Sequence, residues 1–239
     1  EKEVDQYLAT HPEDASKDPQ QRNKIKFYLS QKALIQRRLD YMASLREKAD
    51  YKFLLKPPER PRTKIVIDGE PWRGHADAPV TLVHFADLTS KLSAESVEKI
   101  GRLLSEFPEK IKWVHRNYFR IQDEKALLAA ELGEGAFEQG IFWNFHDLMF
   151  SRKGDMKMEN IRKMGDEIGI DKKKFDEGQK KGNYLLKVKA DLGYAARIGV
   201  ENPAVIFVNG FYFGGTFPYE DLKNLVQREL ELKAKASKD

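Results

Sequence analysis

The spacing of apolar residues predicts two helices near the start of the chain. Val4, Tyr7 and Leu8 indicate a short amphipathic helix, which ends near His11-Pro12 because proline disfavours helix in the residue before it. From 19 to about 49, apolar residues recur three, four or seven positions apart along one face: Ile25, Tyr28, Ile35, Leu39, Met42 and Leu45. A helix of about 30 residues is about 45 Å long. Its apolar stripe therefore needs another surface to pack against.

The pattern changes after a proline-rich stretch. Residues 56–63 are rich in proline and charge, which favours extended, semi-rigid backbone, and we interpret them as a linker. β-Branched and apolar runs then predict strands at 65–67, 80–85 and 111–119. Apolar residues at helical spacing predict a helix at 93–107 that stops at Pro108.

A block of helices precedes the last two strands. One helical region covers 123–149, interrupted or bent around Gly133, Gly135 and Gly140, and further helices are predicted at 157–168, 172–180 and 183–198. Strands at 204–209 and 211–214, joined by a turn at Asn209-Gly210, lead into a last helix from 218 to about 235. The order predicts an α/β fold in which a βαβ unit and a ββα unit are separated by a helical insertion at about 123–198.

Composition and charge exclude several classes of function. The 239 residues are 41% hydrophobic and 33% charged, as expected of a folded globular protein. A net charge of +4, spread along the chain, does not indicate binding to nucleic acid. No apolar run reaches the roughly 18–20 residues of a membrane span. The chain begins at Glu1 without a leader-like segment, so we expect that a targeting segment was removed or the chain was trimmed.

The residue types also limit the chemistry. There is no cysteine, which excludes disulfides and thiolate metal sites. The spacing of His75, His84, His115 and His146 is not that of a metal site, so we expect surface or hydrogen-bonded core histidines. The sequence implies no cofactor.

Three segments resemble the DsbA-like branch of the thioredoxin-fold oxidoreductases, which are bacterial proteins of the periplasm or another extracytoplasmic space. Residues 74–87 are similar to the approach to the family's active-site strand, 140–150 to its insert helix, and 196–210 to its cis-proline strand. The resemblance covers about 64–230 and implies a thioredoxin fold with a helical insertion. The family's Cys-x-x-Cys is replaced here by Ser90-Lys91-Leu92-Ser93.

This replacement removes the family's chemistry. A helix N-terminus lowers the pKa of a thiol and so produces the thiolate that attacks a disulfide. Serine oxygen cannot form a disulfide, and its hydroxyl would need a neighbouring general base to become a nucleophile. The sequence has no Gly-x-Ser-x-Gly elbow that would favour a hydrolase. We expect Ser90 to cap the helix instead.

The resemblance implies a peptide-binding site around Pro203. In the family this proline is cis and lies beside the helix N-terminus, where its backbone receives an extended peptide. The expected peptide-binding residues are therefore Pro203, Asn202, Lys91 and Leu92. Two of them depart from the family pattern, because Lys91 stands where proline is frequent and Asn202 where threonine is usual.

The N-terminal helix has a resemblance of its own. Residues 22–58 are similar to the last chaperone-domain helix of SurA-type peptidyl-prolyl isomerases. We predict an N-terminal helical extension at 1–55, which has a chaperone-like or oligomerisation role or covers its own domain, and a DsbA-like domain at 64–236.

Two functional hypotheses follow, with a third for the extension. The first is a redox-inactive DsbA-like protein that binds polypeptide clients or a partner protein. The alternative is a thiol–disulfide oxidoreductase or isomerase whose cysteines at 90 and 93 were deliberately replaced by serine. The departures at Lys91 and Asn202 favour natural loss. The third hypothesis is a homo-oligomer formed through the long N-terminal helix.

Overall fold

The computed structural model describes residues 2–10, 19–48, 61–152, 156–214 and 217–236. The chain divides into two compact units, Glu1–Glu59 and Arg60–Asp239, which are considered separately. Most of the predicted linker at 56–63 lies outside the described residues. Within the described part, no helix is both long enough and apolar enough to cross a membrane.

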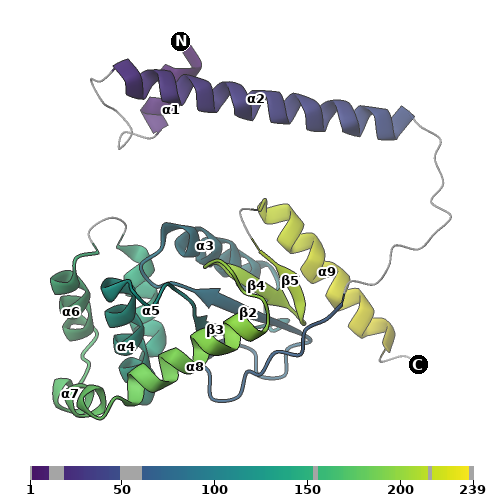
Figure 1. Cartoon of the computed structure of the whole chain (residues 1–239). Helices are drawn as coiled ribbons and strands as arrows, with labels where there is room; N and C mark the ends of the chain where they lie inside the picture. Colours follow the sequence, from purple (N-terminus) through teal and green to yellow (C-terminus); the bar gives the residue numbers. More distant parts are fainter. Residues whose placement is uncertain (1, 11–18, 49–60, 153–155, 215–216, 237–239) are drawn as a thin grey trace. The chain divides into compact units, whose positions relative to one another are not determined.

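The first unit contains two helices, α1 (Lys2–Thr10) and α2 (Pro19–Lys48) (Figure 1). They pack through Val4 and Ile25, which are buried, and the rings of Tyr7 and Tyr28 meet edge to face with centroids 6.2 Å apart. Because α1 is much shorter than α2, it covers only the beginning of the apolar stripe.

The second unit is built on a five-stranded sheet. Its strands are β1 (Trp72–Gly74), β2 (Val80–Ala86), β3 (Ile111–Asn117), β4 (Val205–Val208) and β5 (Phe211–Phe213), in the order β1-β3-β2-β4-β5. Strands β2 and β3 are parallel and are connected by α3 (Lys91–Glu106), whereas the other pairs are antiparallel. The βαβ and ββα units predicted from the sequence therefore form one sheet.

Alternate residues of the strands face opposite layers of helices, as the period of a strand requires. Leu82 and Trp113 face one core cluster, with Ile100 of α3 and Val226 of α9 (Tyr219–Ala236). Val83, Phe85, Val114 and Phe207 face the other, with Ala195 of α8 (Asn183–Arg197). Both faces of the central strands are thus covered.

The insertion consists of α4 (Glu124–Glu138), α5 (Phe142–Ser151), α6 (Met158–Glu167), α7 (Lys172–Lys180) and α8. Helices α4 to α7 gather beside the sheet, on the side away from α9 (Figure 1). The helical region predicted at 123–149 is two helices, and the chain turns at Gly140 with a φ of 76°. Gly133 and Gly135 stay inside α4, where aromatic rings pack against them.

The strand predicted at 65–67 does not form. The N–H of Val66 donates to the Tyr194 hydroxyl at 2.9 Å, and the Arg116 guanidinium donates to the carbonyl of Val66 at 2.8 Å. These backbone groups therefore bond to side chains instead of to a neighbouring strand. The antiparallel edge of the sheet is formed by β1, a few residues later.

Close packing in the insertion gives a stability prediction. A Cβ added at Gly135 would lie 2.6 Å from the ring of Phe175, whereas one at Gly193 on α8 would meet nothing within 4 Å. We expect Gly135→Ala to lower the free energy of unfolding by about 1–3 kcal/mol through overpacking. Gly193→Ala should raise it by about 0.5–1 kcal/mol, because alanine favours helix. Denaturant titration of both variants measures these changes. Equal changes in the free energy of unfolding would contradict the close packing of Phe175 against Gly135.

Candidate functional site

The candidate site lies at the carboxyl ends of the two parallel strands. Asp87 follows β2 directly and Tyr118 follows β3, so both residues are at the same edge of the sheet. A groove of about 880 Å³ opens there. It is lined by Asp87, Tyr118, Phe119, Arg120, Gln122, Asp123, Glu124, Lys125, Met158, Glu201, Asn202 and Pro203.

Ser90 caps α3, as the sequence predicts. Its backbone is extended, with φ −86° and ψ 131°, and its hydroxyl oxygen accepts the N–H of Ser93 at 3.5 Å. Its carbonyl accepts the N–H of Ala94 at 3.0 Å. Such a cap satisfies groups that otherwise lack partners in the first turn and is worth about 1 kcal/mol.

Ser93 has a structural role as well. Its side chain is fully buried, and its hydroxyl oxygen accepts the N–H of Asp87 at 3.1 Å. The Asp87 carboxylate in turn accepts the N–H and the hydroxyl of Thr89, both at 2.7 Å. Burial raises the pKa of Asp87, although the bonds from Thr89 oppose this. Both serines thus stabilise the turn between β2 and α3.

Pro203 differs from the prediction, because the bond before it is trans. The turn here consists of Pro203 and Ala204, and Ala204 adopts a left-handed φ of 71°. A proline with a fixed negative φ followed by a left-handed residue is the pattern of a type II turn, which needs no cis bond. The N–H of Ala204 then donates to the carbonyl of Phe85 at 2.9 Å, so that β4 still joins β2.

The groove includes only some of the predicted peptide-binding residues. Asn202 and Pro203 line it, but Lys91, which is exposed, and Leu92, which is half-buried, do not. Its other lining residues, such as Asp87 and Tyr118, were not predicted. Their position immediately after two strands was the available signal, because ligands of open α/β sheets bind at the carboxyl ends of the strands.

The lining of the groove carries more negative than positive groups. Its carboxyl groups belong to Asp87, Asp123, Glu124 and Glu201, and its cations are Arg120 and Lys125. The carboxylate of Asp123 also caps α4 by accepting two backbone N–H groups. The lining of the groove therefore has an excess of acidic groups, whereas the chain as a whole has a net charge of +4. In the described part of the chain, no group of three or more His, Asp or Glu side chains could hold a metal ion.

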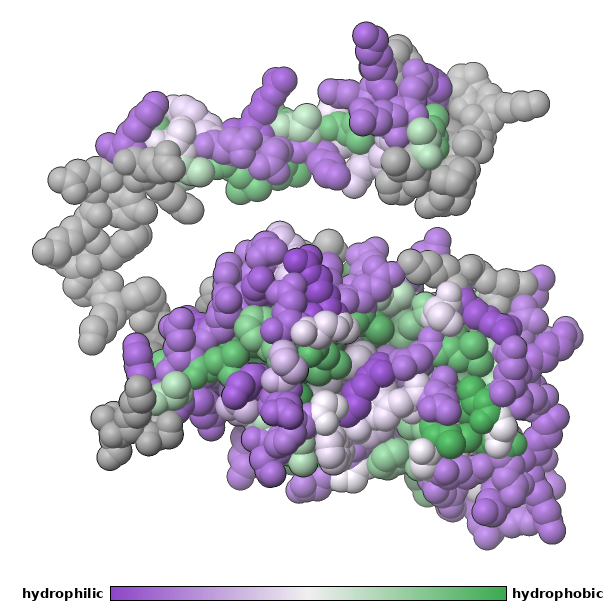
Figure 2. Space-filling model, turned by 180° about the vertical axis from the view of Figure 1, so that it is seen from behind, coloured by the Kyte–Doolittle hydropathy of each residue, from purple (hydrophilic) through white to green (hydrophobic). Residues whose placement is uncertain are grey.

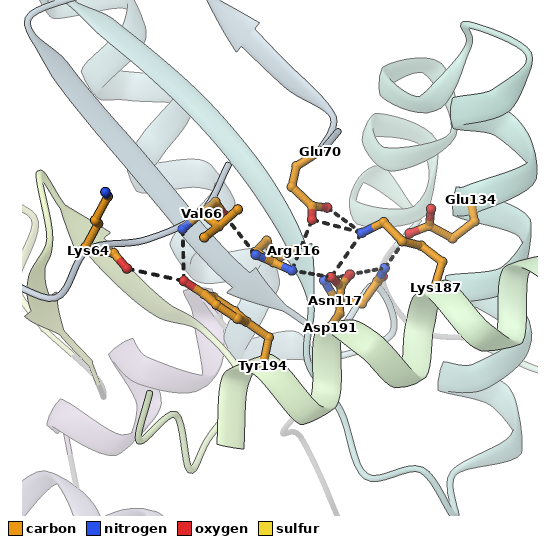
Figure 3. Close-up of polar contacts among 9 residues, drawn as sticks. All are labelled: Lys64, Val66, Glu70, Arg116, Asn117, Glu134, Lys187, Asp191 and Tyr194. Atoms are coloured by element: carbon orange, nitrogen blue, oxygen red, sulfur yellow. Dashed lines mark hydrogen bonds and ion pairs between the residues drawn. The ribbon is translucent and has the colours of Figure 1, made fainter. Parts of the chain in front are cut away.

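A buried group of charges, here called the ion cluster, supports the end of β3 (Figure 3). It consists of Glu70, Arg116, Glu134, Lys187 and Asp191. Arg116 lies 2.8 Å from the carboxylate of Asp191 and 3.0 Å from that of Glu70. Lys187 contacts the same two carboxylates at 2.8 Å (Glu70) and 3.1 Å (Asp191). The cluster therefore joins β3, α8 and the segment before β1.

Asn117 connects the ion cluster to the groove. It is the last residue of β3, and its side-chain amide donates to Glu134 of α4 at 2.7 Å and to Asp191 of α8 at 3.1 Å. Its backbone N–H also donates to Asp191, at 3.2 Å. The next residue, Tyr118, lines the groove. The position of the groove wall thus depends on buried polar contacts.

The ion cluster has three carboxyl groups but only two cations. Burial, together with repulsion from Asp191 and Glu70, raises the pKa of Glu134 to about 7, against an opposing effect of Lys187 and Asn117. A protonated Glu134 leaves two carboxylates facing Arg116 and Lys187, which balances the charge.

The fold defines a thioredoxin-fold protein, and its sequence contains no cysteine. A family model described as thioredoxin matches residues 67–228, and the chain belongs to this family, in its DsbA-like branch. BdbD from Bacillus subtilis superposes with a TM-score of 0.62 at 21% identity, covering 71% of this chain and 97% of that one. Wolbachia pipientis α-DsbA1 superposes with a TM-score of 0.61 at 14% identity, covering 72% of this chain and 96% of that one.

A third solved structure is a periplasmic thioredoxin-like protein from Salmonella enterica serovar Typhimurium. Its TM-score is 0.58 at 15% identity, over 68% of this chain and 90% of that one. Among curated proteins, the Na(+)/H(+) antiporter NhaA 1 of Salinispora arenicola is 28% identical over 156 residues, which are 64% of this chain and 24% of the antiporter. The chain thus spans about a quarter of the length of this relative.

The family model leaves α1 and α2 outside its match. The resemblance of the N-terminal helix to a SurA-type chaperone segment stays a prediction.

The charge balance of the ion cluster predicts a stability that depends on pH. Because the pKa of Glu134 is raised on folding, its stabilising effect is present at low pH and is lost as the pH rises through about 7. Glu134→Gln keeps an acceptor for Asn117 but cannot ionise. We expect this variant to be more stable than the parent chain by about 3 kcal/mol at pH 8 and by only about 1 kcal/mol at pH 5, because the loss begins at the unfolded pKa and is complete above the folded one.

Thermal and urea unfolding at the two pH values measures this difference. Glu131→Gln, one turn earlier on α4 and bonded to Gln179 rather than to the ion cluster, controls for the loss of a carboxylate from this helix. A gain for Glu134→Gln of the same size at both pH values would contradict the assigned ionisation.

Proposed function

We propose that this chain is a redox-inactive, DsbA-like module that binds extended polypeptide segments in the groove beside Pro203. The observation that carries the proposal is the retained groove at the carboxyl ends of β2 and β3, next to a helix tip where Ser90 and Ser93 serve as structural acceptors. Without a thiol, this site has no disulfide to exchange, and binding is the activity that its geometry supports.

The lining suggests which polypeptides fit. Phe119, Met158 and Pro203 supply apolar surface, and Tyr118 adds an aromatic ring with a hydroxyl. The excess of carboxyl groups favours lysine or arginine in the client, because complementary charge increases the rate and specificity of association. We therefore propose extended segments that alternate apolar and basic side chains.

Reversal of one charge tests this preference. Glu201 is exposed and lines the groove. We expect Glu201→Lys to weaken binding of a fluorescent peptide with alternating leucine and lysine by about fivefold at low salt, or about 1 kcal/mol. Anisotropy titration of the full chain gives the dissociation constants, and added salt should reduce the difference.

Asp176→Lys provides the matched control, because Asp176 is an exposed carboxylate on α7 that does not line the groove. Its effect should be well below that of Glu201→Lys. Equal weakening by both variants would mean that the peptide senses only net charge, and it would refute binding in the groove.

The alternative function is a thiol–disulfide oxidoreductase or isomerase whose two cysteines were deliberately replaced by serine. It requires that the natural gene encode cysteine at positions 90 and 93. The departures at Lys91 and Asn202 and the trans bond at Pro203 support natural loss instead. Cysteine codons at both positions would favour the alternative.

A second candidate role concerns the N-terminal unit, for which we propose self-association through α2. Apolar pairs recur every seven residues on this helix, at Phe27-Tyr28, Leu34-Ile35 and Tyr41-Met42. Phe27, Leu34 and Tyr41 are 67%, 61% and 63% exposed, and Figure 2 shows apolar side chains along the surface of the helix. A seven-residue apolar repeat is typical of helices that supercoil around one another, so we propose a second copy as the partner.

Light scattering of the full chain tests self-association. We expect a mass above that of one chain, and the monomer mass for a variant that combines Leu34→Glu with Tyr41→Glu, because buried carboxylates oppose association. Ala33→Glu, also exposed but outside the apolar pairs, should leave the mass unchanged. A monomeric parent chain would refute this role.

We also propose an extracytoplasmic location and a division of the chain at 1–55, 56–63 and 64–236. The location is supported by the DsbA-like relatives, of which the Salmonella enterica protein is periplasmic. The division is supported by the two compact units, which separate after Glu59.

A further inference from the structure

Three histidines are buried together between the sheet and α5. His84 of β2 and His115 of β3 are direct partners in the parallel ladder, and His146 comes from α5. Their exposed fractions are 0%, 1% and 0%. The ring centroids of His115 and His146 are 5.6 Å apart. We call these three residues the histidine layer.

Aromatic rings surround the histidine layer. Trp113 of β3 lies 5.1 Å from the His146 ring, and Phe142 of α5 lies 5.0 Å from the His115 ring. On α5 itself, Trp143 and Phe150 are both 4.8 Å from His146. The contact between α5 and the sheet therefore consists largely of neutral imidazole and aromatic rings.

The histidines have few polar partners. Neither ring nitrogen of His84 or His115 makes a hydrogen bond of ordinary geometry to a described residue, and the same is true of Nε2 of His146. Nδ1 of His146 lies 2.8 Å from the carboxylate of Asp147. An imidazolium has two N–H donors, so protonation would leave several buried donors unsatisfied.

The charged groups that face the layer come from three elements. Arg73 of β1 covers the rings of Trp113 and Trp143, with its guanidinium carbon 4.5 and 4.1 Å from their centroids, and is paired with Asp147. Asp147 favours a proton on His146, whereas Arg73 opposes it. Lys187 of α8 opposes a proton on His115, and Asn117 favours it.

Burial is the main influence on all three histidines. It lowers the pKa of His84 to about 3 and that of His146 to about 4, and it places that of His115 well below the usual 6.5. When folding lowers the pKa of a histidine, its contribution to stability is fully present above the pKa that it has in the unfolded state. This contribution is lost as the pH falls from that value toward the pKa in the folded state. The affected range here begins near pH 6.5.

We propose that the histidine layer is an acid-sensitive latch, in which proton uptake by His84, His115 and His146 releases α5 from the sheet. If a histidine is protonated only when α5 is released, the equilibrium constant for release rises tenfold for each pH unit of acidification. Three such histidines together raise it by up to about a thousandfold per pH unit. Glu134 acts in the opposite direction, because its raised pKa means that the folded state takes up its proton near neutral pH. It offsets at most one of the three histidines.

Hydrogen exchange of the unmodified full chain between pH 7.5 and 4.5 tests the latch. Protection of the α5 amides, corrected for intrinsic exchange and compared with that of α9, should fall below pH 6.5 by at least one hundredfold per pH unit. The tryptophan fluorescence should change in the same range, since Trp113 and Trp143 contact the layer. Constant α5 protection down to pH 5, or a parallel loss of α9 protection, would overturn the proposal.

Variants identify the groups that take up the protons. His146→Gln cannot be protonated, so it should reduce the pH dependence of α5 release by about tenfold per pH unit. His75→Gln is the matched control, because His75 is exposed and outside the layer, and it should behave like the parent chain. If His146→Gln does not fold, His84→Gln replaces it. If α5 release depends on pH as steeply in His146→Gln or His84→Gln as it does in His75→Gln, the proposal is overturned.

Discussion

The contact between Arg116 and Asp191 is the interaction on which the second unit depends most. It joins the inner strand β3 to α8, the last helix of the insertion, and both side chains are almost fully buried. Removal of one partner of such a pair leaves an uncompensated charge and costs about 3–5 kcal/mol. Because Asn117 shares Asp191 and precedes the groove residue Tyr118, the same contact fixes the insertion, the end of β3 and one wall of the groove.

The ion cluster and the histidine layer respond to acid in opposite ways. In the cluster, Glu134 has no cation of its own, so the folded state gains from protonating it. In the layer, the one carboxylate among the described residues that pairs with a histidine is Asp147, beside His146, so the folded state gains from keeping the histidines neutral. Both effects arise because ionisable side chains are buried without enough opposite charges to pair with them. Acid therefore stabilises the contact of α4 with β3 and weakens that of α5 with the sheet.

The sequence predicts those elements that the local pattern of residues determines. It fails where contacts with residues distant in the sequence determine the structure. The buried strands, α3 and α7 follow from apolar runs, helical spacing and caps such as Ser90. The strand expected at 65–67 was wrong, because its backbone bonds to Arg116 and Tyr194, which lie 50 and 128 residues away. The ion cluster joins residues about 75 positions apart, as in Arg116 and Asp191, and no local signal reveals such a pair. At the site, the cap and Asn202 and Pro203 could be predicted, but the trans bond depends on the turn made with Ala204.

The groove charge bears on why serine occupies positions 90 and 93. A reactive thiolate is stabilised by positive surroundings, such as a helix N-terminus without nearby carboxylates. Here Asp87 lies between β2 and that helix N-terminus, and its carboxyl group lines a groove with three more. Negative charge so close to the helix tip would raise the pKa of a thiol and oppose its ionisation. Serine hydroxyls do not need to ionise, and those of Ser90 and Ser93 accept backbone hydrogen bonds in their neutral form. The surroundings of the N-terminus of α3 are therefore suited to the neutral hydroxyls that are present.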